Sequence, residues 1–418
     1  GESHLDELAC SDALMDSLAL GKPWYVMEHS TSAVQWKPLN TRKRAGELMR
    51  DSLAHVAMGA DAICFFQWRQ SKSGAEAFHS AMLPHAGADS KVFRGVCELG
   101  KALKTLSDAG LQGTELERAG TAILFSAESE WATRSETLPS MKLNHWHDVR
   151  DWYRGFLDAG LRADVVPLAY DWTDYKTIVL PTVLSLSDED VRRIADFAKA
   201  GGTVIVGYAT GLIDEYFHIG LGGYPGAGNG LLRDMLGIRS EEFNILGEEA
   251  EGEPNEISLS NGLTTRLWQN DVTSVAADAT VLASYAGESA ADWELERTPA
   301  ITSRPYGNGT AIYVGCDLNR HDIAQLLKAL GFRWRELSAQ PTEGGQTPTY
   351  PTTDPRILHT IRRSPDGSTR FDFYLNRSNQ PVAINGVEGK PIIAHRCETD
   401  AVGYTLNRNA ILIAKTSC

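Results

Sequence analysis

The sequence predicts an α/β protein that ends in a small antiparallel β-domain. Short apolar runs of about four to six residues alternate with amphipathic helical segments as far as residue 338. Beyond a Pro-, Thr- and Gly-rich linker at 340–355, only short alternating strands remain. With 418 residues, the chain is long enough for two or three domains.

Two β/α units open the chain. Apolar residues predict a first strand at 24–27 and a second at 62–66. Leucines before Gly21 predict an initial helix. Thr41 is the expected N-cap of a helix that runs to Met58, and a further helix is expected over 90–109.

The alternation resumes after residue 112. Strands are predicted at 121–125, 162–167, 177–181, 203–207 and 310–315, and helices at 144–159, 187–200 and 322–330. Parallel strands separated by helices predict a doubly wound α/β domain over residues 113–338. The last module, residues 350–418, reads as five or so short strands joined by turns.

The charge balance excludes some partner classes. Forty Lys and Arg residues face 54 Asp and Glu residues, which gives a net charge of −14. A nucleic-acid backbone or an anionic membrane surface is therefore not an expected partner. No run of eighteen apolar residues is present. The six cysteines form no C-x-x-C pair, so a reducing, cytoplasmic setting is expected.

Glu28 is the first candidate for chemistry. It ends the apolar run of the first strand and precedes the small polar residues His29 to Ser32. Catalytic groups of parallel β/α units lie at such strand ends, although an ordinary solvated glutamate fits the spacing as well. The second strand runs in the same way into Trp68, Glu76 and His79.

Taken together, these two stretches resemble the end of the catalytic barrel of glycoside hydrolase family 42, the retaining β-galactosidases. The resemblance rests on a Met-Glu pair with Trp36 eight residues further on, and on FFQWRQS followed by GAE and FHS. It implies that residues 1–112 hold the last two β/α units of a (β/α)8 barrel. It also implies an amidotransferase-like domain at 113–338 that builds a homotrimer, and a small C-terminal β-domain.

The resemblance also implies roles for individual residues. Glu28 would be the nucleophile, which attacks the anomeric carbon of a β-galactoside such as lactose or a galacto-oligosaccharide. Trp36 would stack on the sugar, and Glu76 and His79 would form hydrogen bonds with galactose hydroxyls. The remaining two positions, Phe65 and Trp68, would shape the wall of the site. No cofactor and no metal are implied.

The sequence departs from the family pattern in one important respect. The family's acid/base lies in an Asn-Glu pair at the end of the fourth barrel strand, whereas Asn255-Glu256 lies in a polar stretch of the second domain. At most two barrel units fit before residue 112, and a complete barrel needs about 250 residues. We therefore expect a truncated chain that is inactive by itself, because it lacks the group that protonates the leaving group.

Two alternative functions fit the sequence less well. A non-catalytic oligomerisation or carbohydrate-binding module would not need the aromatic and acidic residues after the second strand. An amidotransferase needs a cysteine at a strand-to-helix elbow, and the candidate elbow at 180–187 has none. A metal site at His145 and His147 is also disfavoured, because positions i and i+2 of a helix point about 200° apart.

Overall fold

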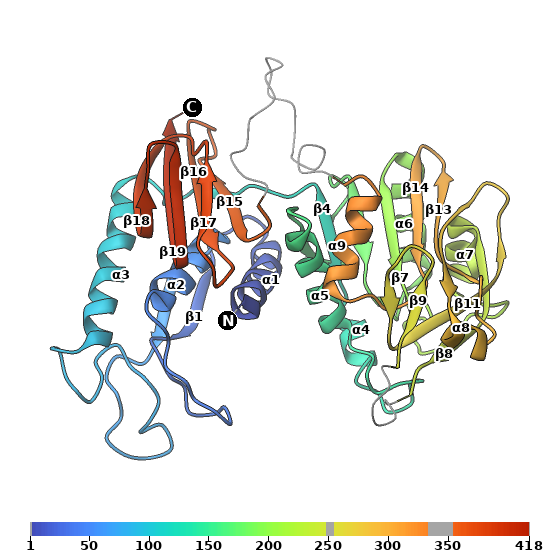
Figure 1. The fold of residues 1–418 in the computed structure, drawn as a ribbon, viewed down its shortest axis with the longest axis horizontal. Coiled ribbons are helices and arrows are strands. Elements are labelled where there is room, and N and C mark those ends of the chain that lie inside the picture. Colours follow the sequence, from blue (N-terminus) through green and yellow to red (C-terminus); the bar gives the residue numbers. More distant parts are fainter. Residues whose placement is uncertain (1, 248–254, 333–353, 418) are drawn as a thin grey trace. The chain divides into compact units, whose positions relative to one another are not determined.

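The computed structural model describes residues 2–247, 255–332 and 354–417, and Figure 1 shows their helices and strands. The chain divides into two compact units. Unit 1 combines residues 1–118 with residues 340–418, and unit 2 consists of residues 119–339. Most of the predicted linker at 340–355 lies outside the described residues.

Unit 1 begins with three helices and two strands. Their bounds are α1 (Glu2–Ala19), β1 (Tyr25–Ser30), α2 (Glu47–Ala57), β2 (Ala62–Phe66) and α3 (Lys91–Asp108). The strands β1 and β2 pair in parallel, as the predicted β/α pattern requires. One prediction is wrong: α2 begins after Gly46 rather than after Thr41, because residues 37–46 form a loop.

The rest of unit 1 is an antiparallel sheet. Its strands are β3 (Glu115–Leu116), β15 (Ile357–Arg363), β16 (Thr369–Asn376), β17 (Val382–Asn385), β18 (Lys390–Thr399) and β19 (Gly403–Ser417). The order is β17-β19-β16-β15-β3, and β18 also pairs with β19. The predicted antiparallel strands after residue 350 are thus confirmed. They fold together with residues from the start of the chain, because β3 pairs with β15.

Unit 2 is built on a nine-stranded sheet. Five of its strands are parallel and lie in the order β5-β4-β6-β7-β14: β5 (Asp164–Pro167), β4 (Thr121–Phe125), β6 (Thr177–Leu180), β7 (Thr203–Gly207) and β14 (Gly309–Val314). The central strands are buried on both faces, which explains their unbroken apolar sequences.

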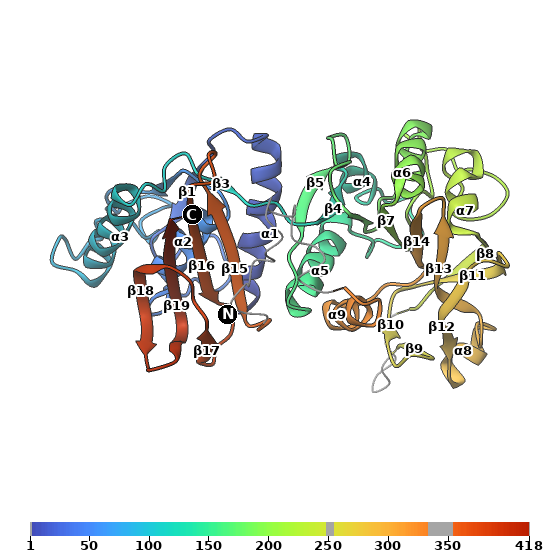
Figure 2. The same cartoon turned by 90° about the horizontal axis from the view of Figure 1, so that it is seen from above.

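Helices cover both faces of this sheet. In Figure 2, α5 (His145–Asp158) and α9 (Arg320–Ala329) lie on one face, and α6 (Asp188–Ala200) and α7 (Leu231–Leu236) lie on the other. The prediction for α6 is confirmed in detail. Ser187 and Asp190 form a capping box at its start, and Gly201 ends it with a φ of 122°.

The antiparallel part of unit 2 was not predicted. Its strands are β8 (Ile238–Ile245), β9 (Ile257–Leu259), β10 (Thr264–Thr265), β11 (Trp268–Val275), β12 (Thr280–Ala286) and β13 (Pro299–Tyr306). The remaining short helices of unit 2 are α4 (Ala127–Ala132), η1 (Gly228–Gly230) and α8 (Glu288–Asp292). The strands β13, β12, β9 and β10 extend the sheet beyond β14, and β8 and β11 form a separate pair. The whole chain is therefore a mixed α/β structure with a small antiparallel sheet.

Candidate active site

Glu28 lies in β1 at an irregularity of the strand. Val26 pairs with Ile63 and His29 pairs with Phe65, so two residues of β1 face one residue of β2. Such a bulge changes the direction in which a side chain projects, and bulges are frequent beside active sites. The side chain of Glu28 is exposed, as a carboxylate that meets a substrate must be.

Trp36 and His79 come together although they are far apart in the sequence. Their rings stack with a centroid separation of 5.1 Å and an interplanar angle of 27°. Two hydrogen bonds hold their loops together: the amide of Ser80 donates to the carbonyl of Ala33, and the amide of Ser32 donates to Ser80 Oγ, both over 2.9 Å. The indole remains 62% exposed, so one of its faces can still receive a ligand.

His79 is buried, and only one of its two ring nitrogens forms a hydrogen bond within the described residues. Its Nδ1 donates to the carbonyl oxygen of Ser80 over 2.8 Å. Its ring packs edge-on against the ring of Phe66, with 5.0 Å between the two centroids. Its Nε2 has no hydrogen-bond partner among the described residues. A buried nitrogen without a partner costs about 1–3 kcal/mol, so a ligand hydroxyl that donates to it would bind favourably.

Of the remaining predicted site residues, Phe65 lies close to Glu28, and Trp68 packs elsewhere. Phe65 lies against His29, the neighbour of Glu28, with 5.5 Å between ring centroids. Trp68 instead contacts Phe93 of α3 at 6.3 Å and is 61% exposed. The side chain of Glu76 is exposed, and its carbonyl accepts the amide of His79 over 3.0 Å. A tight turn therefore joins Glu76 and His79, while Trp68 packs toward α3.

The end of β1 is fixed by a polar network that the sequence did not reveal. Lys43 Nζ donates to His29 Nε2 over 3.3 Å and to Asp51 Oδ2 over 3.1 Å. Arg50 donates to Asp51 Oδ1 with two nitrogens, over 2.9 and 2.7 Å, and to Asn409 over 2.7 Å. The network holds the residue next to Glu28 in place from α2 and β19. Arg50 and Asp51 are both buried although they are charged, and their adjacent opposite charges in α2 were the available signal in the sequence.

Burial and charge set the protonation states in this network. Burial and the nearby Lys43 lower the pKa of His29 to about 3, so its imidazole is neutral and accepts a hydrogen bond from Lys43. Burial alone would raise the pKa of Asp51, but the hydrogen bond from His4 and the charges of Lys43 and Arg50 outweigh it and hold that pKa well below its ordinary value. The carboxylate of Asp51 thus stays ionised and accepts hydrogen bonds from Lys43 and Arg50.

The histidines of α5 are engaged in structural contacts. Burial lowers the pKa of His145, whose Nδ1 donates to the carbonyl of Pro181 over 2.9 Å while its Nε2 accepts the amide of Ser126 over 2.9 Å. His147 lies 3.8 Å from Asp148 and from Asp151. Within the described ranges, no group of three His, Cys, Asp or Glu side chains is placed to hold a metal ion.

The turn after β6, within the candidate elbow at 180–187, contains a buried threonine and no cysteine. Thr182 is fully buried with a left-handed φ of 48°, and its hydroxyl donates to Asp148 over 2.5 Å. Tyr208 donates to the same carboxylate oxygen over 2.7 Å. In the part of the chain that the structure describes, no helix is long and apolar enough to cross a membrane.

Comparison with protein families gives three consecutive matches. Residues 1–106 match the model of a β-galactosidase domain, residues 119–338 match a β-galactosidase trimerisation domain, and residues 357–416 match a β-galactosidase C-terminal domain. Among curated proteins, the chain is 43% identical over 416 residues to β-galactosidase BbgII of Bifidobacterium bifidum and 38% identical over 383 residues to a β-galactosidase of an Arthrobacter species. These alignments include 99% and 92% of this chain.

Solved structures are similar over nearly the whole chain. The β-galactosidase of Bacillus circulans sp. alkalophilus aligns with a TM-score of 0.81 at 26% identity, and that of Rahnella sp. R3 aligns with 0.82 at 25% identity. Both alignments cover 99% of this chain and 58% or 57% of the other. The chain likewise spans 58% and 51% of the two curated relatives, a little over half of their length.

Proposed function

The chain belongs to the β-galactosidases of glycoside hydrolase family 42, and we propose that it supplies the nucleophile and part of the sugar-binding wall of a retaining β-galactosidase. The observation that carries the proposal is an exposed Glu28 on an irregular strand end, beside the buried network of His29 and Lys43. Support comes from the relatives, since each is named a β-galactosidase. The proposed substrates are β-galactosides such as lactose or galacto-oligosaccharides.

In this proposal, β1 and β2 are the last two strands of a (β/α)8 barrel within residues 1–112. Residues 113–338 form an amidotransferase-like trimerisation domain, and residues 350–418 form the C-terminal β-domain. The parallel pairing of β1 and β2 supports the first assignment, and the parallel strand order of unit 2 supports the second. The setting is cytoplasmic, and neither cofactor nor metal takes part.

The mechanism assigns one chemical step to Glu28. Its ionised carboxylate attacks the anomeric carbon, the bond to the leaving oxygen breaks, and a covalent galactosyl-enzyme forms. Trp36 packs against the apolar face of the sugar. The exposed side chain of Glu76 and Nε2 of His79 accept hydrogen bonds from its hydroxyls. Phe65 and Trp68 contribute the apolar wall that excludes water from the reacting carbon.

The second carboxylic acid must come from outside these 418 residues. A retaining glycosidase needs a proton donor about 5–5.5 Å from its nucleophile. The one Asn-Glu pair of the sequence ends in Glu256, which belongs to unit 2 and forms an ion pair with Arg266 over 2.9 Å. We therefore propose that this chain does not turn over β-galactosides unless the missing acid is supplied.

A chromogenic aryl β-galactoside assay on the purified chain and on Glu28→Gln tests the proposal. No turnover by either protein is the expected result. Turnover that Glu28→Gln abolishes would refute the proposed inactivity and support the nucleophile. Equal turnover by both would refute the role of Glu28.

The trimer is tested separately, because assembly does not depend on catalysis. Light scattering during size exclusion is expected to give about three times the chain mass of 45.7 kDa. A monomer at micromolar concentration would contradict the proposed trimer. Since residues 119–338 match a trimerisation domain, the assembly is expected to survive Glu28→Gln unchanged.

A further inference from the structure

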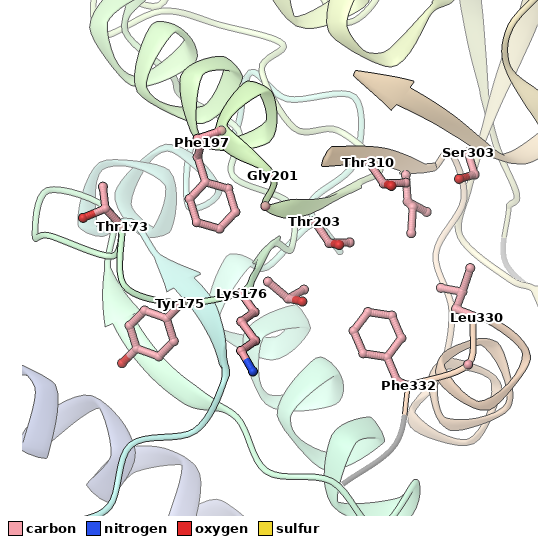
Figure 3. A pocket seen from close by; sticks show the side chains of 15 residues that line it. Thr173, Tyr175, Lys176, Phe197, Gly201, Thr203, Ser303, Thr310, Leu330 and Phe332 are labelled. Atoms are coloured by element: carbon pink, nitrogen blue, oxygen red, sulfur yellow. The ribbon is translucent and has the colours of Figure 1, made fainter. Parts of the chain in front are cut away.

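A pocket of about 630 Å³ lies in unit 2, at the edge of the nine-stranded sheet where its parallel strands begin (Figure 3). The first residues of β6, β7 and β14 line it, together with the C-terminal ends of α6 and α9. Its volume falls within the range of about 300–1,000 Å³ that small-molecule sites occupy. All of its lining residues belong to unit 2, so its function can be considered without reference to Glu28.

Three threonines form one wall of this pocket. Thr177, Thr203 and Thr310 pair in register on adjacent parallel strands, so their side chains project from the same face of the sheet. Thr177 is only 3% exposed. Among the described residues, none of these three hydroxyls has a hydrogen-bond partner. Thr203 and Thr310 are half-buried. Each of the three hydroxyls can both donate to and accept from a ligand.

The opposite wall is apolar. Leu330 and Phe332 follow α9, whereas Phe197 lines the pocket from α6, on the other face of the sheet. In Figure 3 the ring of Phe332 and the side chain of Thr203 flank the same opening. A sugar presents hydroxyls around its rim and C–H groups on its faces, so a row of hydroxyls opposite an aromatic ring matches its chemistry.

The electrostatics favour a neutral ligand over an anion. Both α6 and α9 end at the pocket, with Gly201 and Leu330 as their C-caps, and helix C-termini carry partial negative charge. Of the residues that line the pocket, only Lys176 bears a formal charge. An anion would be repelled by the two helix ends, whereas a polyol can donate hydrogen bonds to their carbonyls.

We propose that this pocket is a binding site for a neutral carbohydrate of one or two sugar units. The site goes beyond the proposed catalytic function, because it lies in the part of the chain that matches a trimerisation domain. Sugar bound there contacts the three threonine hydroxyls at the sheet edge and the ring of Phe332, which follows α9. The ligand is not chemically altered.

Methyl NMR on the intact 418-residue chain tests the site, with D-galactose and lactose as probes. Saturable shifts of the Ile312 and Leu330 methyl groups are expected, because both residues line the pocket. The methyl group of Ile411 in β19 serves as the reference that does not shift. The proposal is overturned if Ile312 and Leu330 do not respond up to roughly 50 mM sugar, which corresponds to less than about 2 kcal/mol of binding. A response to inorganic phosphate in place of sugar would overturn the neutral class.

Substitutions then test which threonine hydroxyls bind the sugar. Thr203→Val and Thr310→Val keep the branched shape and remove one hydrogen-bonding group, so each is expected to weaken binding about 3- to 10-fold. Thr273→Val, at an exposed position of β11 outside the pocket, is the matched control and leaves the affinity unchanged. Glu28→Gln is also expected to leave these shifts unchanged, which separates the pocket from galactose bound near β1. Wild-type affinity in both pocket variants would refute the proposal.

Discussion

Replacement of Arg362 by methionine removes a side chain that joins β15 to residues from the start of the chain. Arg362 is 2% exposed. Its guanidinium donates to the carbonyl oxygens of Val56, Ala60 and Thr114 over 3.0, 3.1 and 2.6 Å. It also donates to Thr114 Oγ1 over 3.1 Å and to Asp61 over 3.2 Å. Methionine fills similar volume but donates to none of these acceptors.

The expected loss is about 3–5 kcal/mol in the free energy of unfolding of unit 1. A single hydrogen bond from a charged donor contributes about 1.5–3 kcal/mol, and contributions from one group are not additive. Removing one partner of a buried charged pair costs about 3–5 kcal/mol. The lost contact with Asp61 contributes least to this cost, because the Asp61 side chain is 25% exposed and water can replace the arginine there. The three buried carbonyl groups have no such replacement.

Hydrogen–deuterium exchange with peptide resolution measures this loss in the intact chain. Because the chain has two units, a single unfolding midpoint would mix their stabilities. Peptides from β15 and β16 are expected to lose protection, while peptides from β6 and β7 keep theirs. Arg363→Met is the control, since Arg363 lies on the same strand in a partly exposed pair with Glu117 and should cost less than about 1 kcal/mol. A loss below 1 kcal/mol for Arg362→Met would refute the reasoning.

Three further predictions concern other parts of the two units. Burial and Lys43 lower the pKa of His29 to about 3 from an ordinary value of 6.5, so the folded state binds fewer protons than the unfolded state between these values. The stability of unit 1 should therefore fall as the pH drops through this window, by at most about 1.4 kcal/mol per pH unit, and His29→Gln should make that slope shallower. An unchanged slope in the exchange protection of β1 and β2 peptides, corrected for the intrinsic pH dependence of exchange, would contradict this. Ser187→Ala removes the N-cap of α6 and should cost about 1 kcal/mol, measured by hydrogen–deuterium exchange in peptides of α6, whereas Ser187→Thr should cost little. Asp6→Asn weakens the two hydrogen bonds that the buried Arg377 donates to Asp6, at 2.7 and 2.9 Å. It should lower the hydrogen-exchange protection of α1 and β16 by about 3 kcal/mol, and faster exchange in α1 alone would contradict this.

Much of the parallel part of the fold was predictable because local signals and burial agree there. The strands β6 and β7 are short apolar runs buried on both faces, and α6 has a capping residue, acidic residues in its first turn and a glycine at its end. The antiparallel strands β8 to β13 escaped prediction because they lack clean alternation. In β11, for example, Gln269 and Asn270 are buried and are satisfied by side-chain hydrogen bonds.

The candidate site was predictable only as a set of residues. Glu28, Trp36 and His79 stand out in the sequence because of their types and spacing. The stack of Trp36 on His79 depends on a hydrogen bond between the amide of Ser80 and the carbonyl of Ala33, which no local pattern encodes. The wrong start of α2 has a related cause. Residues before Glu47 leave the helix so that Lys43 can reach His29 and Asp51.

The pairing of both chain ends within unit 1 has a consequence for synthesis on the ribosome. Unit 2 is continuous in sequence and can fold as soon as residue 339 has left the exit tunnel. Unit 1 must wait, because β16 pairs with β19 and β19 ends at Ser417. During that interval β1 and β2 remain without the strands and the arginine contacts that later stabilise them. Slow codons or chaperone binding over β19 would therefore affect the assembly of the Glu28 region, although β19 is synthesised more than 350 residues after Glu28.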